Sequence, residues 1–311
     1  MPEQRHILIT GSHRSGTTWV GRTISQHQSV KYVHEPFNID RPLPHYGLTL
    51  DHWFEHFDSS SHQEQISLVF EILFGRLGGR VAFRTWKQNH KLLIPLLAGV
   101  IRKALAQRIL VKDPIALLSA GWLYRNYDLQ VICMIRSPLA FVGSTKAVGW
   151  DFDFNNFRNQ RALMDGMLSR YAEQIESLCD QRSGDFIDRM SLLWNVLHFS
   201  IAKYREQYSD WLYLRHEDIA SRPIDAFCEV FRHLGIGMNQ RIRQYINQYT
   251  SDHSLQRDGS ASYRPRDARS LPFNWKTRLS EKEAQRVTES TQSIASLFYP
   301  PGFGVDPASR E

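Results

Sequence analysis

The sequence predicts an α/β protein with a doubly wound, mostly parallel sheet that carries helices on both faces. Short apolar segments without polar alternation recur along the chain, as in strands buried on both faces. Amphipathic helical patterns separate these segments, and alternation of strands with helices is typical of doubly wound sheets. A Gly-rich turn between the first strand and the first helix completes the pattern.

The expected strands cover residues 7–10, 30–33, 80–84, 108–112, 130–135 and 211–215. The expected helices cover residues 17–26, 63–77, 91–105, 116–124, 140–146, 157–178, 187–207, 223–234 and 281–297.

A chain of 311 residues suits one large domain, and we expect a single domain over residues 1–311. Residues 155–207 have helical patterns and no strand signal, so they predict a helical insertion on the substrate side. Residues 249–274 are rich in Ser, Asp, Arg and Pro with little periodicity, which predicts a functional loop or a disordered segment.

Composition favours an ordinary globular protein, with 42% hydrophobic residues. No segment approaches the roughly 18 apolar residues that would span a bilayer. The first six residues lead into a strand without a signal-peptide pattern, so we expect a cytoplasmic protein or the soluble part of a longer one. Three scattered cysteines favour buried thiols over a disulfide framework or a zinc site.

The net charge of +6 is modest and comes with no clustered basic module. The sequence therefore predicts no nucleic-acid partner. A basic cleft for a small polyanion is the more economical interpretation.

The segment from Gly11 to Gly16 has the features of a phosphate-binding loop. It joins an apolar strand to a helix, so backbone N–H groups and the helix dipole meet in one concavity. The spacing Gly11-x4-Gly16 matches a P-loop, but Thr17 stands where a P-loop has Lys. The loop is therefore expected to hold a phosphate other than the β,γ-phosphates of a nucleoside triphosphate.

Side chains in this segment add donors to the backbone groups. Arg14 offers a planar fork for two anionic oxygens, and Ser15, Thr17 and Thr18 offer hydroxyls. Trp19 offers a flat face for a purine. The predicted binding residues here are Ser12, His13, Arg14, Ser15, Gly16, Thr17, Thr18 and Trp19.

A second anion site is predicted after residues 131–135. This apolar strand delivers Arg136 at its carboxyl end, where α/β sheets bind ligands. Pro138 suits the first turn of the following helix. Ser144 lies two helical turns beyond Ser137, so Arg136 and Ser144 are expected to share one phosphate.

Together these two motifs resemble those of sulfotransferases that use 3′-phosphoadenosine 5′-phosphosulfate (PAPS). In that family the first motif binds the 5′-phosphosulfate and the second binds the 3′-phosphate. The resemblance is closest to carbohydrate sulfotransferases of the N-acetylglucosamine 6-O type and to their bacterial relatives. It implies the P-loop-like sulfotransferase fold.

Further segments carry the same resemblance over most of the chain. They are Gln26–Val30 leading to His34-Glu35-Pro36, Leu214–Ile219 with Pro223, and Trp275–Ser280. The resemblance implies transfer of a sulfuryl group from PAPS to a hydroxyl of a carbohydrate or other small acceptor, with PAP as product. It leaves the acceptor and the oligomeric state open.

The resemblance also implies catalytic roles. Arg14 is placed for the bridging oxygen, and Lys112 matches a strand-end Lys near the sulfuryl group. Cytosolic relatives have a His base two residues after that Lys, but Pro114 stands here. Glu35 is therefore the first choice for the base, with His34 and Asp113 as alternatives. No metal is expected, because PAPS lacks a triphosphate and protein cations can stabilise the charge.

The 3′-phosphate clamp of cytosolic relatives precedes their C-terminal Trp-Lys pair. The matching offset here is Ala268-Arg269-Ser270, so that triplet is not kept. Arg264, Arg266 and Arg269 lie on this loop, and Arg264 and Arg269 are the predicted substitutes.

Two other classes of protein remain as alternatives. A P-loop kinase or NTPase would bind ATP with magnesium, against which the missing Lys at position 17 argues. A non-catalytic anion or glycan binder on the same fold would explain the missing His base.

Overall fold

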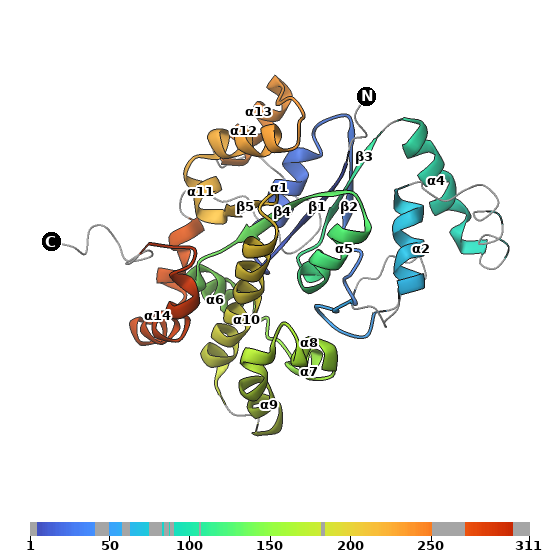
Figure 1. Cartoon of the computed structure of the whole chain (residues 1–311). Coiled ribbons are helices and arrows are strands. Elements are labelled where there is room, and N and C mark those ends of the chain that lie inside the picture. Colours follow the sequence, from blue (N-terminus) through green and yellow to red (C-terminus); the bar gives the residue numbers. More distant parts are fainter. Residues whose placement is uncertain are drawn as a thin grey trace.

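Five parallel strands form one sheet in the order β2-β3-β1-β4-β5 (Figure 1). This computed structural model describes residues 5–40, 50–57, 63–74, 83, 87, 90–105, 107–181, 184–250 and 271–300. The strands are β1 (His6–Gly11), β2 (Val30–His34), β3 (Arg108–Lys112), β4 (Leu129–Ile135) and β5 (Leu212–Arg215). The predicted α/β class and its parallel sheet are confirmed.

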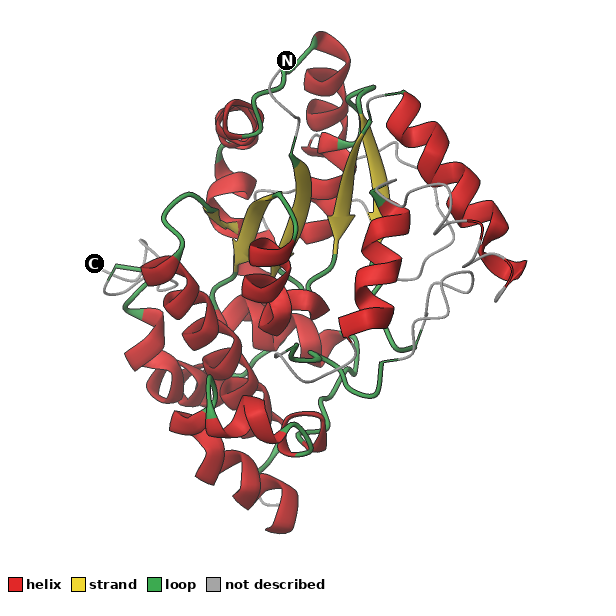
Figure 2. Cartoon of the chain, turned by 45° about the vertical axis from the view of Figure 1, so that its right-hand side comes forward, coloured by secondary structure: helices red, strands yellow, loops and turns green. Residues whose placement is uncertain are grey.

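The helices connect these strands and cover both sheet faces (Figure 2). They are α1 (Thr17–Ile24), α2 (Gln63–Leu73), α4 (Leu93–Ala104), α5 (Ala120–Asn126), α6 (Pro138–Ala147), α7 (Asn155–Arg158), α8 (Arg161–Asp165), α9 (Ala172–Gln181), α10 (Phe186–Gln207), α11 (His216–Ser221), α12 (Pro223–His233), α13 (Gln240–Thr250) and α14 (Glu281–Ala295). Short 3₁₀ turns are η1 (His90–Leu92), η2 (Ile115–Ser119), η3 (Ser169–Tyr171) and η4 (Leu271–Thr277).

Successive strand residues point to opposite faces, so each apolar strand supplies two cores. In β1, Ile7 and Ile9 pack with α1, α12 and α13, whereas Leu8 packs on the other face with α2, α5 and α10. Cys133 and Met134 of β4 divide in the same way. Burial on both faces explains why the strands are uniformly apolar rather than alternating.

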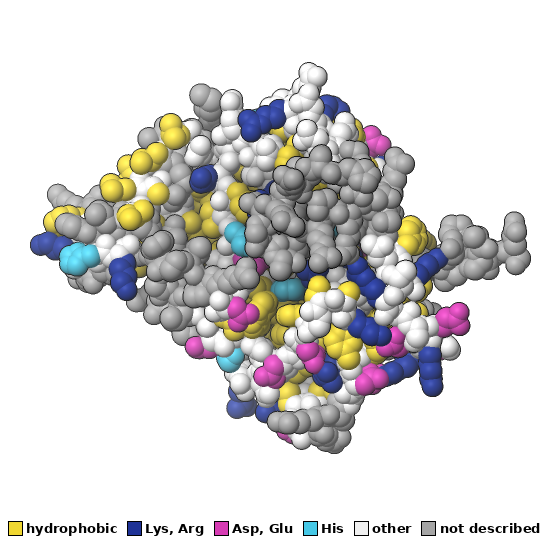
Figure 3. Space-filling model, turned by 180° about the vertical axis from the view of Figure 1, so that it is seen from behind, with side chains coloured by type: hydrophobic (Ala, Val, Ile, Leu, Met, Phe, Trp, Pro, Cys, Tyr) yellow, Lys and Arg dark blue, Asp and Glu magenta, His cyan; other side chains and the backbone are white. Residues whose placement is uncertain are grey.

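At the outer edge beyond β2, α4 packs against α2. Apolar side chains gather on the outside of the molecule at this edge, together with Lys and His side chains (Figure 3). No helix among the described residues is long and apolar enough to cross a membrane.

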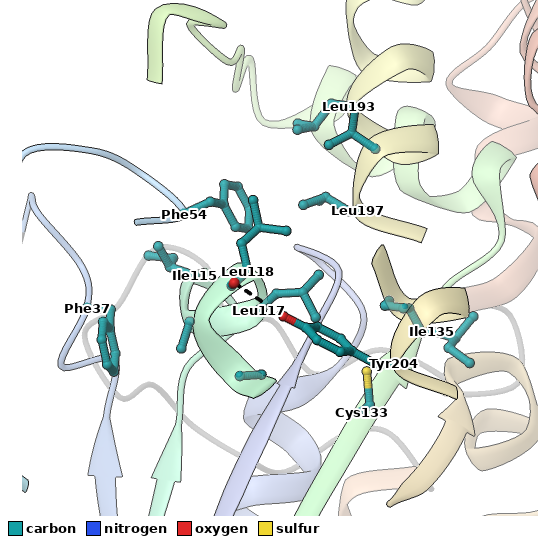
Figure 4. Close-up of a cluster of buried hydrophobic side chains, with 14 of the residues drawn as sticks. Phe37, Phe54, Ile115, Leu117, Leu118, Cys133, Ile135, Leu193, Leu197 and Tyr204 are labelled. Carbon is teal, nitrogen blue, oxygen red and sulfur yellow. Dashed lines mark hydrogen bonds between the residues drawn. The ribbon is translucent and has the colours of Figure 1, made fainter. Parts of the chain in front are cut away.

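The core on the α10 side draws residues from distant segments (Figure 4). Leu117 and Leu118 of η2 pack near Cys133 and Ile135 of β4 and near the inner face of α10. The Tyr204 hydroxyl donates to the Leu118 carbonyl oxygen at 3.2 Å. This buried hydrogen bond fixes η2, and with it the carboxyl end of β3, against α10.

Several predicted elements were wrong in detail. The helix expected over residues 157–178 is divided among α7, α8, η3 and α9. Near the first break, between α7 and α8, two polar side chains hold the loop around residue 55. Asn156 Oδ1 accepts from Trp53 N, and Gln160 Oε1 accepts from His56 N. The helix expected over residues 116–124 begins as the 3₁₀ turn η2 because Asp113 Oδ1 accepts from Ile115 N.

The strand expected at residues 80–84 is not supported. Phe83 is helical, and the rest of that range lies outside the described residues. Two helices were not predicted, α11 and α13. Residues 155–207 are helical with no strand among their described residues, while their treatment as an insertion in a single domain stays a prediction.

Gly11 ends β1 in a conformation that excludes other residues. Its φ is 132°, and a Cβ there would lie 2.1 Å from the Met134 carbonyl oxygen of β4. We expect Gly11→Ala to lower the free energy of unfolding by about 2 kcal/mol or more, measured by urea denaturation. Gly237→Ala is the matched control, since no atom lies within 4 Å of its Cβ position; an equal loss in both variants would contradict this account.

Candidate active site

The carboxyl ends of all five strands meet at one edge of the sheet, because every strand is parallel to its neighbours. In sheet order this edge carries Glu35, Lys112, the loop over residues 12–16, Arg136 and His216. Ligands bind at this edge in open α/β sheets. The structure thus brings together the strand-end residues predicted from the sequence.

The loop after β1 is held against β4 and opens toward α1. Ser12 N donates to the Met134 carbonyl oxygen at 3.1 Å, and the Ser15 hydroxyl donates to the Ser12 carbonyl oxygen at 2.6 Å. Gly16 has φ 86° at the start of α1, where no side chain caps the helix. The first N–H groups of α1 therefore have no side-chain competitor for an anion.

The two predicted anion motifs touch each other. Arg14 Nε donates to Ser144 Oγ at 3.1 Å, and Arg136 donates to the Arg14 carbonyl oxygen. The Arg14 guanidinium thus lies toward the second motif, and Arg14 itself has φ 60°. One small ligand with two anionic groups can reach both motifs.

Arg136 is buried and held by α10. The indole Nε1 of Trp194 donates to the Arg136 carbonyl oxygen at 2.8 Å, and Arg136 N donates to His198 Nε2 at 3.4 Å. The pKa of Arg136 is lowered to about 10, chiefly by burial; Glu217 acts to raise it, and Arg14 and Arg278 act to lower it. The guanidinium remains charged at neutral pH and available to a phosphate.

Lys112 and Glu35 form an ion pair at the ends of β3 and β2. Lys112 is fully buried, with its stem against Gly21 of α1, and Glu35 also accepts from Asn38 Nδ2 at 2.9 Å. Burial raises the pKa of Glu35, but the Lys112 charge and hydrogen bond and the Asn38 bond outweigh it, so the pKa is lowered. Burial also lowers the pKa of Lys112, although the charge and the hydrogen bond of Glu35 act to raise it.

The two alternative bases differ in access. Asp113 is fully buried, and its carboxylate accepts from Phe37 N at 2.7 Å and from Ile115 N at 3.0 Å. Burial raises the pKa of Asp113 to about 7, but its oxygens hold backbone groups rather than facing an acceptor. His34 is exposed beside Glu35, with Nε2 3.7 Å from Glu35 Oε2.

His13 lies in an aromatic cluster that the sequence did not predict. Its ring stacks on Trp150 with centroids 4.9 Å apart and 2° between planes, and it lies 5.5 Å from the Trp53 ring. Burial lowers the pKa of His13 to about 4, with Glu35 raising it and Arg14 and Lys112 lowering it. His13 is therefore neutral at pH 7 and within electrostatic reach of the ion pair.

The structure does not support Trp19 as a purine platform. Its indole is 2% exposed, stacks on Tyr249 at 4.8 Å and meets the Phe227 ring edge. Because these rings belong to α12 and α13, Trp19 belongs to the core between α1 and those helices. Thr17 beside it is buried, whereas Thr18 is partly exposed.

His216 is a site residue that the sequence analysis passed over. A Cβ on Gly16 would lie 2.6 Å from His216 Nδ1, so this ring closes the loop from the β5 side. Burial lowers the pKa of His216 to about 3. Glu217 next to it accepts from Ser137 N and from the Tyr299 hydroxyl, each at 3.0 Å, so its carboxylate holds the start of α6 and the end of the described chain together.

The C-terminal segment reaches the second motif. A Cβ on Gly143 would lie 3.0 Å from the Trp275 Cβ, so η4 packs closely on α6 next to Ser144. The predicted loop residues Arg264, Arg266 and Arg269 lie outside the described residues.

The residues at this edge fit a nucleotide with two anionic ends. Several buried polar atoms here have no hydrogen-bond partner among the described residues: Ser12 Oγ, His13 Nδ1, Arg136 Nε, His216 Nδ1 and His216 Nε2. Buried polar atoms left unpaired in a folded protein commonly belong to a binding site. A ligand with phosphate and purine groups would satisfy them.

Comparison with known proteins identifies the class. A model of the sulfotransferase family matches residues 6–240. The fold is similar to the sulfotransferase domain of the Synechococcus PCC 7002 olefin synthase, at 14% identity and a TM-score of 0.51, with 96% of each chain covered. It is also similar to the sulfotransferase domain from the curacin biosynthetic pathway, at 16% identity and a TM-score of 0.49, covering 93% of this chain and 97% of that one. No curated protein matches the sequence.

A mouse sulfotransferase, SULT7A1, complexed with PAP is similar at 10% identity and a TM-score of 0.42, covering 94% of this chain and 84% of that one. Because the family model spans most of the chain, this protein belongs to the sulfotransferase family and is a sulfotransferase. The fold and the enzyme class predicted from the sequence are thereby confirmed.

His198 makes the stability of the fold depend on pH, because its ring accepts a hydrogen bond from the backbone N–H of Arg136. Burial lowers its pKa from 6.5 to about 3, so Nε2 is unprotonated at neutral pH and accepts from Arg136 N at 3.4 Å. The unfolded state then binds more protons than the folded state below pH 6.5, so stability falls as pH falls. His198→Gln should reduce this slope by up to about 1.4 kcal/mol per pH unit, measured by urea unfolding between pH 7 and 5. An unchanged slope would contradict the assignment.

Proposed function

We propose that this sulfotransferase moves the sulfuryl group of PAPS to a hydroxyl of a carbohydrate or other small ring-containing acceptor. The observation that carries the proposal is the direct contact between the two anion motifs, Arg14 with Ser144 and Arg136 with the Arg14 carbonyl. Such contact brings a 5′-phosphosulfate site and a 3′-phosphate site within the span of one nucleotide. The cytoplasmic location expected from the sequence stays a prediction.

The first loop is suited to the phosphosulfate end. Its uncapped helix start and the unpartnered Ser12 hydroxyl supply neutral donors, which hold an anion without neutralising it. Arg136 and Ser144 are suited to the 3′-phosphate, since a buried guanidinium and a buried hydroxyl together match its oxygens. Bound PAPS would supply an activated sulfuryl group on a phosphate leaving group.

Lys112 and Glu35 are placed to work as a pair. The acceptor oxygen forms its bond to sulfur as the bond from sulfur to the phosphate oxygen breaks. Lys112 stabilises the negative charge on the sulfuryl and leaving oxygens. Glu35 takes the acceptor's hydroxyl proton, and its basicity rises when Lys112 turns its charge toward the sulfuryl group.

The aromatic cluster of His13, Trp53 and Trp150 supports an acceptor with ring faces. Trp53 and Trp150 are partly exposed, while His13 joins them to the loop that holds the phosphosulfate. Flat indole faces bind the C–H faces of sugars as well as aromatic rings. His13 also lies near Glu35 and Lys112, whose charges act on its pKa in opposite directions.

Three substitutions test the division of roles. Lys112→Met should lower kcat by about 10²–10³-fold, and Glu35→Gln by about 10²–10⁴-fold, because both act in the transition state. Both should retain PAP affinity within a few-fold. Ser144→Ala should instead weaken PAP binding about fivefold through one lost hydrogen bond. Turnover is measured as PAP release with a sugar panel, and affinity by calorimetry.

The outcome also separates the alternatives. A kinase or NTPase would show a larger thermal shift with ATP and magnesium than with PAP, since ligand binding raises the melting temperature by mass action. A non-catalytic binder would bind PAP and release none from PAPS with any acceptor. Either result would overturn the proposed function.

Trp150→Ala should raise KM for the acceptor about two- to tenfold while leaving PAP affinity unchanged, because a stacked face is worth about 0.5–1.5 kcal/mol. Trp122→Ala is the matched control, a partly buried Trp that contacts Phe57 and Tyr127 instead of the loop. Equal KM in wild type and Trp150→Ala would remove the aromatic cluster from the acceptor site.

A further inference from the structure

The α4 edge carries an exposed apolar stripe. Ile94, Leu97, Ile101 and Leu105 follow the spacing of one helix face, and each is between 54% and 72% exposed. Val100 beside the stripe is also more than half exposed, as is Phe83 in the segment before α4. Single exposed apolar residues are ordinary, but a contiguous set on one helix marks an interaction surface.

The opposite side of α4 already has its partner. Leu96 is buried, and α4 packs on α2 through that side. An outer helix of a globular protein normally has a polar outward face. Here the outward face is apolar as well, so the stripe is not explained by packing within the described residues.

The sequence of this part of the chain is basic, with seven Lys or Arg and no Asp or Glu among residues 72–107. Of these, the structure describes the side chains of Lys87 and Lys91, and both are exposed. Lys91 lies in η1 directly before α4, and Lys87 Nζ lies 5.2 Å from the centre of the Phe83 ring. Figure 3 shows this edge of the molecule with apolar, basic and His side chains gathered together.

We propose that the α4 edge lies on an anionic lipid bilayer surface. An apolar stripe enters the boundary of the acyl region, and exposed Lys side chains meet acidic headgroups. This occupant uses both the apolar and the basic character of the edge. A nucleic acid would interact only with the basic side chains and leave the apolar stripe exposed. A second copy of the same edge would bring like charges together.

The arrangement is that of a helix that lies in the interface. With twelve residues, α4 is too short to span a bilayer, whereas its stripe runs along the helix axis from Ile94 to Leu105. The strength of binding then depends on both apolar insertion and salt-sensitive attraction.

The test is co-sedimentation of the full chain with vesicles of phosphatidylcholine alone or mixed with phosphatidylglycerol. Wild type should bind the mixed vesicles at least about tenfold more tightly, and less so at high salt. The triple variant Ile94→Ser, Leu97→Ser, Ile101→Ser and the double variant Lys87→Glu, Lys91→Glu should each lose about tenfold or more.

Matched controls come from the other side of the molecule. Leu297→Ser replaces an apolar side chain that is 52% exposed, and Lys282→Glu reverses an exposed charge on α14. Both should bind vesicles as wild type does. All variants should keep PAP release with a water-soluble acceptor, so the vesicle result stands apart from the test of the enzyme.

Three outcomes would overturn the proposal. The first is equal binding of both vesicle types, and the second is vesicle binding that both α4 variants retain in full. The third is self-association through the stripe, seen in analytical ultracentrifugation as a wild-type dimer that the triple variant converts to a monomer, with no vesicle binding by either. Circular dichroism confirms that the surface variants fold.

Discussion

The whole site depends on how closely the loop after β1 approaches β4. Gly11 lies so near the Met134 backbone that no side chain fits between them, and the Ser12 N–H bonds the Met134 carbonyl oxygen. This contact places the Arg14 carbonyl within reach of the Arg136 guanidinium. The two motifs predicted to bind anions, which are more than a hundred residues apart in the sequence, thereby contact each other directly.

The second constraint is electrostatic. Basic side chains at the carboxyl edge are buried, and burial alone would disfavour their charges. Each is compensated differently: Lys112 by the carboxylate of Glu35, and Arg136 by backbone oxygen and the nearby charge of Glu217. The edge therefore holds two buried cations, each beside its own compensating groups.

The sequence predicted the sheet and its edge well, because apolar strands and strand-end residues are local signals. Glu35, Lys112 and Arg136 came together because parallel strands must end at one edge. Trp19 was misjudged because α13 was not foreseen, and Tyr249 of that helix covers the indole. His13 gained its role from stacking on Trp150, a contact between segments more than a hundred residues apart that no local pattern reveals.

In the mechanism that we propose, the Glu35–Lys112 pair explains how one carboxylate can bind a proton weakly before the reaction and accept one during it. While Lys112 is bonded to it, Glu35 has a lowered pKa and attracts a proton weakly. Charge that develops on sulfuryl oxygens competes for the same ammonium, and each fraction of that bond lost by Glu35 increases its affinity for the acceptor's proton. In the mechanism that we propose, Glu35 therefore removes the proton most readily when the sulfur–oxygen bond is breaking, so the acceptor is activated mainly when a sulfuryl donor is in place.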